Sequence, residues 1–360
     1  MDRWDEPFDS SYRVMRVNPK TRLETGRIVG ILNGGSIDRN LDVAHFESGS
    51  LDFVGDPGIG NDLVAVCNDA TFEDGAVVRE KLGTFMASSP KSTFRGEAET
   101  GALSLYGLLH MAAAPFEEPF VVQPGTLAMD AVKDVLALAG LRVVAEDSSD
   151  YAVGEQRVYG LGDDDSTMVS AANDLLDLMG FEHCMTNADG DVRLRKYVDP
   201  ASRAPAHEFA EGRDARFFNE LVHEYDRFDV PNVVVVGYSA QDFSGQASAV
   251  DDDPASRYSI ASVGRRIPYR ETLSDLPEGC TEPQAKELAA AKARALLDGK
   301  QSVIRRITFQ HIYRPLAVAD SIEYRRASIG VSSKFAIRRQ HIDLVAGCPV
   351  EEECREFVRR

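Results

Sequence analysis

The sequence predicts an α+β fold that is rich in β-structure. Three observations predict it: short extended segments separated by turn residues in the first hundred positions, two helical patterns between residues 113 and 210, and a later β-rich region that one helix interrupts. A chain of 360 residues, 43% of them hydrophobic, is long enough to bury two or three separate cores. We therefore expect a multi-domain globular protein.

The first hundred residues have the pattern of a β-barrel or a sandwich. Turn residues recur at Asn18-Pro19, Asn33-Gly34-Gly35, Asp56-Pro57-Gly58, Glu73-Asp74-Gly75 and Ser89-Pro90. The extended candidates between them are Tyr12–Val17, Arg27–Leu32, Ala44–Val54, Leu63–Cys67, Ala76–Met86 and Ala102–Leu105. Short strands at regular spacing are typical of barrels and sandwiches.

The stretch Gly26–Ser36, GRIVGILNGGS, raises the question of a phosphate-binding loop. A Walker loop needs GxxxxGK followed by Ser or Thr, and no lysine stands there; a dinucleotide fingerprint needs GxGxxG ahead of a helix, whereas residues 36–40 lead into more strand. We therefore expect one strand of a barrel and the hairpin corner that joins it to the next strand. The glycines then serve backbone geometry.

Residues 113–210 have the pattern of a small α/β unit. Apolar residues at helical spacing predict helices over 127–139 and 166–179. Thr126 can cap the first helix, and Gly140 and Gly180 follow the two helices as C-terminal caps do. The strand candidates are Leu141–Ala145, Glu182–Met185 and Val192–Tyr197, of which the last two form a hairpin.

The remaining sequence predicts a second β-rich unit. Four valines in Asn232–Gly237 indicate a buried strand, and Ser239–Asp253 reads as a loop. Thr281 and Gln284 form a capping-box pattern that opens an alanine-rich helix from Glu282 to Asp298, closed by Gly299. The strands expected after it are Val303–His311, Ser321–Tyr324 and Phe335–Leu344.

Several motifs suggest binding chemistry, and each has a simpler interpretation. Asn187–Asp191 resembles a calcium loop but lacks the DxDxDG spacing and the distant glutamate, so a tight turn is favoured. The acidic triplets could gather a cation, but Asp163–Asp165 precedes a helix, where carboxylates favour the dipole, and Asp251–Asp253 lies in a polar loop. We expect a capping cluster and a solvated loop, and no metal or cofactor.

No catalytic constellation is visible either. The histidines do not form HExxH or HxH; they are His45, His110, His183, His207, His223, His311 and His341. Ser239 lacks the second glycine of a GxSxG motif. His183 and Cys184 are adjacent, and adjacent residues on a strand point to opposite faces, so they make a poor nucleophile and base. We expect no catalytic residues and no enzyme.

Net charge and cysteine content indicate which partners and which cellular compartment to expect. The net charge is −18, and because residues from Gln301 onward carry 11 Lys/Arg against 7 Asp/Glu, the first 300 residues carry −22. Such an acidic body repels phosphate backbones, although solubility alone also explains it. No membrane segment or signal peptide is visible, so we expect synthesis in a cytoplasm. Five scattered cysteines suggest reduced, buried thiols: Cys67, Cys184, Cys280, Cys348 and Cys354.

Segments in the same order resemble the baseplate hub proteins of tailed phages, the late control protein D-like family, related to the hub part of type VI secretion spikes and to siphophage minor tail proteins. They are Gly34–Asn40 with Glu47–Phe53, Gln123–Leu136, Ala172–Phe181 with the hairpin Asp189–Arg195 and Pro200, Asn232–Gly237, and Pro315 with Ala319–Ser321 and Ile342–Leu344. The family has glycine where this chain has Ala319, so we expect that turn to be shaped differently.

The resemblance implies two barrel-like β domains, at 1–112 and at 211–260 with 303–347, around an α/β insert at 113–210 and a helical insertion at 261–302. Residues 348–360 are expected to form a short charged tail, helical, that docks on a partner or stays mobile. Three chains would build a ring that adapts the hexameric tail tube to a three-fold tip. DNA would only pass through, because an acidic lumen does not hold it.

The resemblance also implies partners and a location. They are the distal tail protein, the tail tube, the tape measure protein and receptor-binding or spike proteins, at the virion tail tip of a phage or prophage. The alternative is a tail-associated cell-wall hydrolase or carbohydrate-binding module, against which the single Trp4 and 8% aromatic residues argue. A third alternative, a cytoplasmic α/β enzyme, requires convergent polar groups that the sequence does not display.

Overall fold

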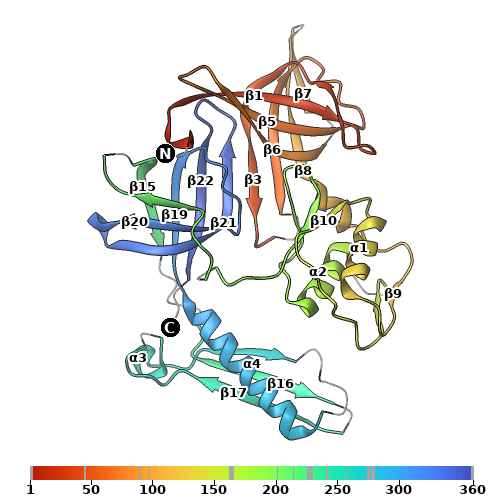
Figure 1. The fold of residues 1–360 in the computed structure, drawn as a ribbon, viewed down its shortest axis with the longest axis vertical. Helices are drawn as coiled ribbons and strands as arrows, with labels where there is room; N and C mark the ends of the chain where they lie inside the picture. The colour runs from red at the N-terminus through yellow and green to blue at the C-terminus, as the bar shows by residue number, and fades with distance from the viewer. Residues whose placement is uncertain are drawn as a thin grey trace.

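The computed structural model describes residues 3–43, 46–88, 91–96, 98–161, 166–200, 202–213, 215–224, 230–240, 242–256, 258–273, 276 and 280–357. The predicted fold class is confirmed, because the chain is an α+β protein dominated by large antiparallel sheets. Figure 1 shows four parts: a first β unit at the top, a second β unit at the left, an insert at the right and a projecting unit at the bottom.

One 14-stranded sheet runs through both β units. The first β unit follows a short 3-10 turn at Arg3–Asp5 and consists of β1 (Phe8–Val17), β2 (Glu24–Arg27), β3 (Ile31–Asn40), β4 (Glu47–Val54), β5 (Leu63–Phe72), β6 (Val77–Ala87), β7 (Lys91–Arg95) and β8 (Ala98–Gly107). The second β unit consists of β14 (His207–Ala210), β15 (Phe217–Glu224), β19 (Val303–Ile312), β20 (Ser321–Arg326), β21 (Val331–Asp343) and β22 (Pro349–Phe357).

The two β units join where β21 pairs antiparallel with β3. The register sets His341 opposite Asp38 and Ile342 opposite Ile37. Ile37 and Ile342 are fully buried in the same hydrophobic cluster, which also holds Leu51 and Val350. The two β units therefore share both a sheet and a hydrophobic core.

The glycine pair lies inside a strand and not at a hairpin corner, so that expectation was wrong. The corner between β2 and β3 falls at residues 28–30, while Gly34 and Gly35 sit in β3 where its register with β4 shifts. Gly35 has φ +94, and a Cβ there would lie 2.2 Å from the Ser50 carbonyl oxygen. The pair thus forms a bulge that needs glycine for backbone geometry.

The insert contains the two predicted helices. It follows the 3-10 segment Leu108–Ala113 and comprises β9 (Phe120–Val122), α1 (Ala128–Leu138), β10 (Val143–Ala145), β11 (Arg157–Tyr159), α2 (Met168–Met179), β12 (Met185–Thr186) and β13 (Val192–Leu194). Thr167 caps α2 in a capping box, and Gly180 ends it at φ +66. The predicted hairpin is present, because β12 pairs antiparallel with β13. The cap expected at Thr126 is displaced by one residue, since Leu127 is the N-cap of α1.

The valine-rich strand belongs to a separate unit, contrary to expectation. β16 (Val233–Ser239) pairs with β17 (Ser244–Val250) and β18 (Pro268–Thr272) in a sheet of their own. The projecting unit also contains α3 (Ile260–Val263) and α4 (Glu282–Ser302). α4 packs Ala285, Ala289 and Ala293 on Val234 and Val236, which explains the alanine-rich sequence. This helix continues through Gly299 to Ser302 and leads directly into β19.

The C-terminal segment is a strand and not a helical tail. Residues Pro349–Phe357 form β22, which lies between β19 and β21 and pairs antiparallel with both. Val350, Glu352 and Cys354 are buried. Alternation of buried and half-exposed positions excludes a helix here. That the five predicted ranges fold as independent domains stays a prediction.

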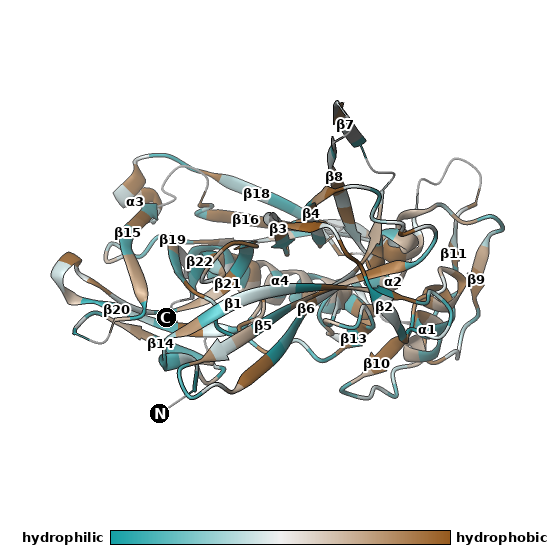
Figure 2. Ribbon diagram, turned by 90° about the horizontal axis from the view of Figure 1, so that it is seen from above, coloured by the Kyte–Doolittle hydropathy of each residue, from teal (hydrophilic) through white to brown (hydrophobic). Residues whose placement is uncertain are grey.

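The insert exposes several large hydrophobic side chains, as the first β unit does. Figure 2 shows β9 and β10 as hydrophobic stretches at the edge of the ribbon. Large hydrophobic side chains that are at least one-third exposed there are Val121, Leu127, Leu138, Val144, Tyr151, Val158, Leu161, Tyr197 and Val198. No helix in the described ranges has the length and apolarity to cross a membrane.

Candidate functional site

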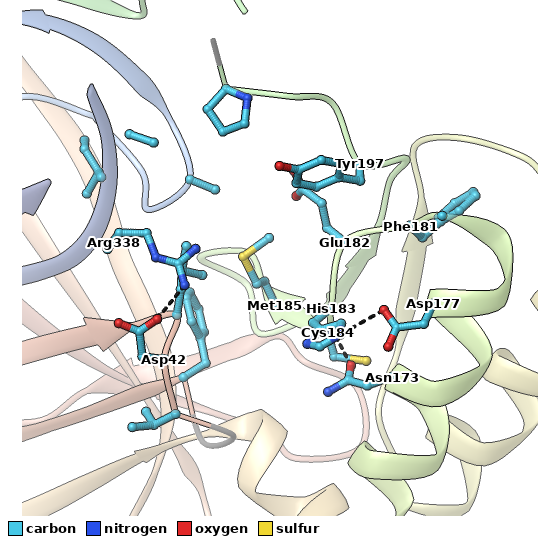
Figure 3. Close-up of a pocket in the computed structure, with 18 of the residues that line it drawn as sticks. Asp42, Asn173, Asp177, Phe181, Glu182, His183, Cys184, Met185, Tyr197 and Arg338 are labelled. Atoms are coloured by element: carbon cyan, nitrogen blue, oxygen red, sulfur yellow. Dashed lines mark hydrogen bonds and ion pairs between the residues drawn. The ribbon is translucent and has the colours of Figure 1, made fainter. Parts of the chain in front are cut away.

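A cavity of about 670 Å³ lies where the first β unit, the insert and the second β unit meet. Leu41, Asp42, Val43 and Phe46, which follow β3, line it from one side, and residues between Asn173 and Arg203 line it from the insert. Ala319 and the β21 residues 336–338 complete the wall. Figure 3 shows Arg338 and Asp42 on one side, facing Glu182, Met185 and Tyr197 of the insert across the opening.

Asp42 ties the first β unit to the second. Its carboxylate accepts hydrogen bonds from Arg338 Nη2 at 2.5 Å and from Arg355 Nη2 at 2.6 Å. Burial alone would raise the pKa of Asp42, but the hydrogen bond and charge of Arg338 and the charge of Arg355 outweigh it and lower that pKa. The carboxylate is therefore ionised and neutralised by two guanidinium groups.

Glu182 holds Arg203, which connects the insert to the second β unit. Its side chain is 8% exposed and binds Arg195 through one carboxylate oxygen and Arg203 through the other. Arg203 also donates hydrogen bonds to the carbonyl oxygens of Val198 at 2.9 Å and Ala319 at 2.7 Å. Because every charge in this cluster has a partner, the arrangement is that of a structural joint.

Ala319 adopts the conformation that glycine favours. Its φ is +68, and its amide donates a 2.8 Å hydrogen bond to the Ile337 carbonyl oxygen. The next residue, Asp320, accepts a hydrogen bond from the Ala317 amide at 2.9 Å and so closes the turn. Ala319 therefore holds a left-handed conformation, at a cost of about 1–2 kcal/mol for a residue with a Cβ.

Replacing Ala319 by glycine should stabilise the protein. We expect Ala319→Gly to raise the free energy of unfolding by about 0.5–1 kcal/mol, because relief of the left-handed strain exceeds the added entropy of the unfolded chain. Urea denaturation measures the change. The matched control is Ala317→Gly, whose φ is not positive and which should be destabilised. Equal losses of unfolding free energy in the two variants would contradict backbone strain at Ala319.

Cys184 and His183 do not form a nucleophile and base. Burial raises the pKa of the Cys184 thiol to about 12, and the thiol is therefore protonated at neutral pH. The Cys184 amide donates to Asn173 Oδ1 at 2.8 Å, while His183 Nε2 lies 3.0 Å from Asp177 Oδ1 on α2 (Figure 3). Cys184 contributes packing, and His183 makes an exposed contact with Asp177.

The loop Asn187–Asp191 is a docking turn. Asn187 Oδ1 accepts hydrogen bonds from the amides of Asp189 and Asp191 at 2.9 and 3.0 Å, which is the geometry of an Asx turn. Lys81 Nζ of β6 binds Asp189 at 2.6 Å, and Thr84 Oγ1 donates to the Ala188 carbonyl oxygen at 2.8 Å. The loop therefore holds the insert against the first β unit.

The other candidate groups stay apart. Asp251 is 5% exposed and accepts a 2.5 Å hydrogen bond from Ser256 Oγ, so it closes a turn; Asp163–Asp165 and His45 lie outside the described residues. Ser239 ends β16, which leads into a second strand and not into the helix of a nucleophile elbow. Within the described ranges, no three His, Cys, Asp or Glu residues are arranged to hold a metal ion.

A buried polar network joins the three parts and escaped sequence analysis. Arg39 of β3 donates to Glu47 Oε1 at 2.7 Å and to Gln340 Oε1 of β21 at 2.6 Å. Thr186 of the insert donates to Glu47 Oε2 at 2.9 Å. Glu47 is 4% exposed and Gln340 is 1% exposed. Charged residues on strands read as surface positions, so only long-range pairing reveals the network.

No family model matches the sequence, and neither does a curated protein. Solved structures do match in fold. A tail protein from Neisseria meningitidis MC58 aligns with a TM-score of 0.68 and 16% identity over 96% of this chain and 97% of that one. A 43 kDa tail protein of prophage MuSo2 from Shewanella oneidensis aligns with a TM-score of 0.62 and 10% identity over 96% and 98%.

A third structure is a component of a type VI secretion system, the E. coli c3393 protein, described as structurally similar to the T4 bacteriophage tail proteins gp27 and gp5. It aligns with a TM-score of 0.51 and 11% identity over 92% of this chain and 74% of that one. At these identities the likeness concerns the fold. The expected resemblance is confirmed at that level: this chain has the fold of phage tail proteins.

Proposed function

We propose that the protein is a structural hub of a phage or prophage tail. The observation that carries this proposal is the match in fold to two tail proteins along nearly the whole of both chains. The joint described above supports it, because paired charges and a shared sheet make a rigid body.

In this proposal three chains form a ring at the tail tip. The ring adapts the hexameric tail tube to a three-fold tip and forms part of the channel through which DNA leaves. Its partners are the distal tail protein, the tail tube, the tape measure protein and receptor-binding or spike proteins. The acidic charge of −18 disfavours retention of DNA, which only passes.

The oligomeric state tests the ring. We expect light scattering after size exclusion, across a concentration series, to give three times the chain mass of 39.5 kDa. Contacts between copies close a ring when the rotation between them closes, and a trimer satisfies this. A stable dimer at all concentrations would contradict the ring.

We further propose that the protein is not an enzyme. The cavity supports this view, because its carboxylates are bound by arginine or histidine side chains. Purified protein should release no soluble fragments from cell-wall material. Release that depended on one carboxylate, such as Asp177, would favour a tail-associated hydrolase instead.

A further inference from the structure

A histidine and a glutamate face each other inside the second β unit. The side chains of His311 on β19 and Glu352 on β22 are 1% and 0% exposed. His311 Nε2 lies 3.3 Å from Glu352 Oε1, and the Gln340 amide of β21 donates to the same oxygen at 2.9 Å. At this depth, an uncompensated charge on either group is very costly.

The hydrogen-bond partners show how many protons the pair holds. His311 Nδ1 lies 2.7 Å from the Ile312 carbonyl oxygen, which can only accept, so Nδ1 carries a hydrogen. Nε2 then faces Glu352 Oε1, and two lone pairs would repel each other unless a proton lies between them. The contact therefore holds one proton, as imidazolium with carboxylate or as imidazole with carboxylic acid. Both forms have zero net charge.

The neighbouring groups described below do not compensate the negative charge that loss of this proton would leave. Arg39 of β3 donates to Gln340 and to Glu47 of β4, and its charge is matched by Glu47. Cys354, two residues along β22, is fully buried, which raises the pKa of its thiol well above the ordinary value. The ring of Phe209, on β14, lies 4.9 Å from the His311 ring and carries no charge. Loss of the proton would leave a buried negative charge at Glu352, whose pKa burial raises.

Gln340 connects the pair to the buried polar network that joins the three parts. Its amide nitrogen donates to Glu352 Oε1 and to the Leu316 carbonyl oxygen, at 2.9 and 3.0 Å. Its amide oxygen accepts from Arg39, which leads through Glu47 to Thr186 of the insert. We propose that the Glu352–His311 pair is a proton-dependent latch. While the pair keeps its proton, it holds this buried network together. When the proton leaves in alkaline solution, the network loosens.

The direction of the pH dependence follows from the proton count. A histidine in an unfolded chain releases its proton near a pKa of about 6.5, whereas the folded pair keeps one. Above that pH folding takes up a proton, and below the ordinary glutamate pKa of about 4.3 the unfolded chain binds one proton more than the folded pair. The stability from the pair is therefore complete between about pH 4.3 and 6.5, and it is lost as the pH rises further. Each proton taken up changes the unfolding equilibrium constant about tenfold per pH unit.

Glu352→Gln tests the latch. The new amide is neutral without a proton, and its nitrogen can donate to His311 Nε2 if it gives up the hydrogen bond from Gln340, so the contact no longer needs a proton. Between pH 6.5 and 8, the unfolding equilibrium constant of the wild type should rise more steeply than that of the variant, by up to about tenfold per pH unit. The matched control is Glu353→Gln, a half-exposed neighbour that binds Arg306 at 3.2 Å and should keep the wild-type slope. Equal slopes in wild type and Glu352→Gln would overturn the proposal.

A second measurement keeps the proposal testable if Glu352→Gln does not fold. His341 also gains from a proton, because burial lowers its pKa but Asp38 and Asp343 more than offset this and raise it. The His341→Asn variant removes that contribution. Refolding it in weak buffer near pH 7.3, where unfolded thiols still keep almost all their protons, should take up close to one proton per chain. Uptake near zero would overturn the latch.

Discussion

Gly35→Ala should cost about 3 kcal/mol of unfolding free energy or more, and we expect most of the variant to be insoluble. Gly35 has φ +94, and an added Cβ would lie 2.2 Å from the Ser50 carbonyl oxygen and 2.9 Å from its carbon. The neighbour is backbone of β4 and cannot rotate away, so strand spacing must change. Strain of a side chain at positive φ adds to the clash.

Because of the position of Gly35, the loss of stability should extend beyond β3 itself. Gly34 and Gly35 exchange hydrogen bonds of 3.0 Å with the backbone of Leu344, so the bulge lies where the first β unit meets the second. Gly75→Ala is the matched control, because Gly75 has φ +80 but no heavy atom within 4 Å of the added Cβ. We expect it to lose only about 1–2 kcal/mol. Equal denaturation midpoints for the two variants would refute the backbone clash.

Glu182→Ala should lose about 3 kcal/mol of unfolding free energy. The change leaves Arg195 and Arg203 side by side with 19% and 17% exposure and no carboxylate between them. Removing one partner of a buried pair costs about 3–5 kcal/mol, because the remaining charge stays buried. Arg203 keeps its bonds to two carbonyl oxygens, which places the loss at the lower end. Urea unfolding and limited proteolysis at residues 198–206 measure it.

A neighbouring ion pair provides the control. Glu146 binds Arg193 of β13 in the same sheet of the insert, with side chains that are 37% and 28% exposed. Solvent screens such a pair, so Glu146→Ala should cost less than about 1 kcal/mol. If both variants lose the same stability, the Glu182 cluster does not act as the joint between insert and second β unit.

Local sequence signals predicted the elements that local chemistry determines. The final glycine of α2, the β12–β13 hairpin and the beginning of α4 at Thr281 all follow from residues within a few positions of each other. The end of α4 did not follow the glycine rule. Gln301, 1% exposed, donates to the Pro231 carbonyl oxygen at 3.0 Å and thereby holds the last turn in place.

Long-range pairing accounts for what sequence reasoning missed. Residues Glu351–Phe357 read as a charged tail because the buried positions of β22 include Glu352 and Glu356, which hide the alternation of a strand. Those glutamates are acceptable only because His311, Gln340 and Arg305 come to them from other strands. In the same way, the valines of β16 announce a buried strand but not which sheet or helix buries it.

The join between β3 and β21 imposes an order on synthesis. Asp38 and His341 are 303 residues apart in the chain, so β3 leaves the ribosome long before the strand that pairs with it. At about 5–20 residues per second, its free edge waits roughly 15–60 s in the nascent chain. The polar side chains of Asp38, Arg39 and Asn40 on that edge then protect it from pairing with other nascent strands, so they serve synthesis as well as the finished protein.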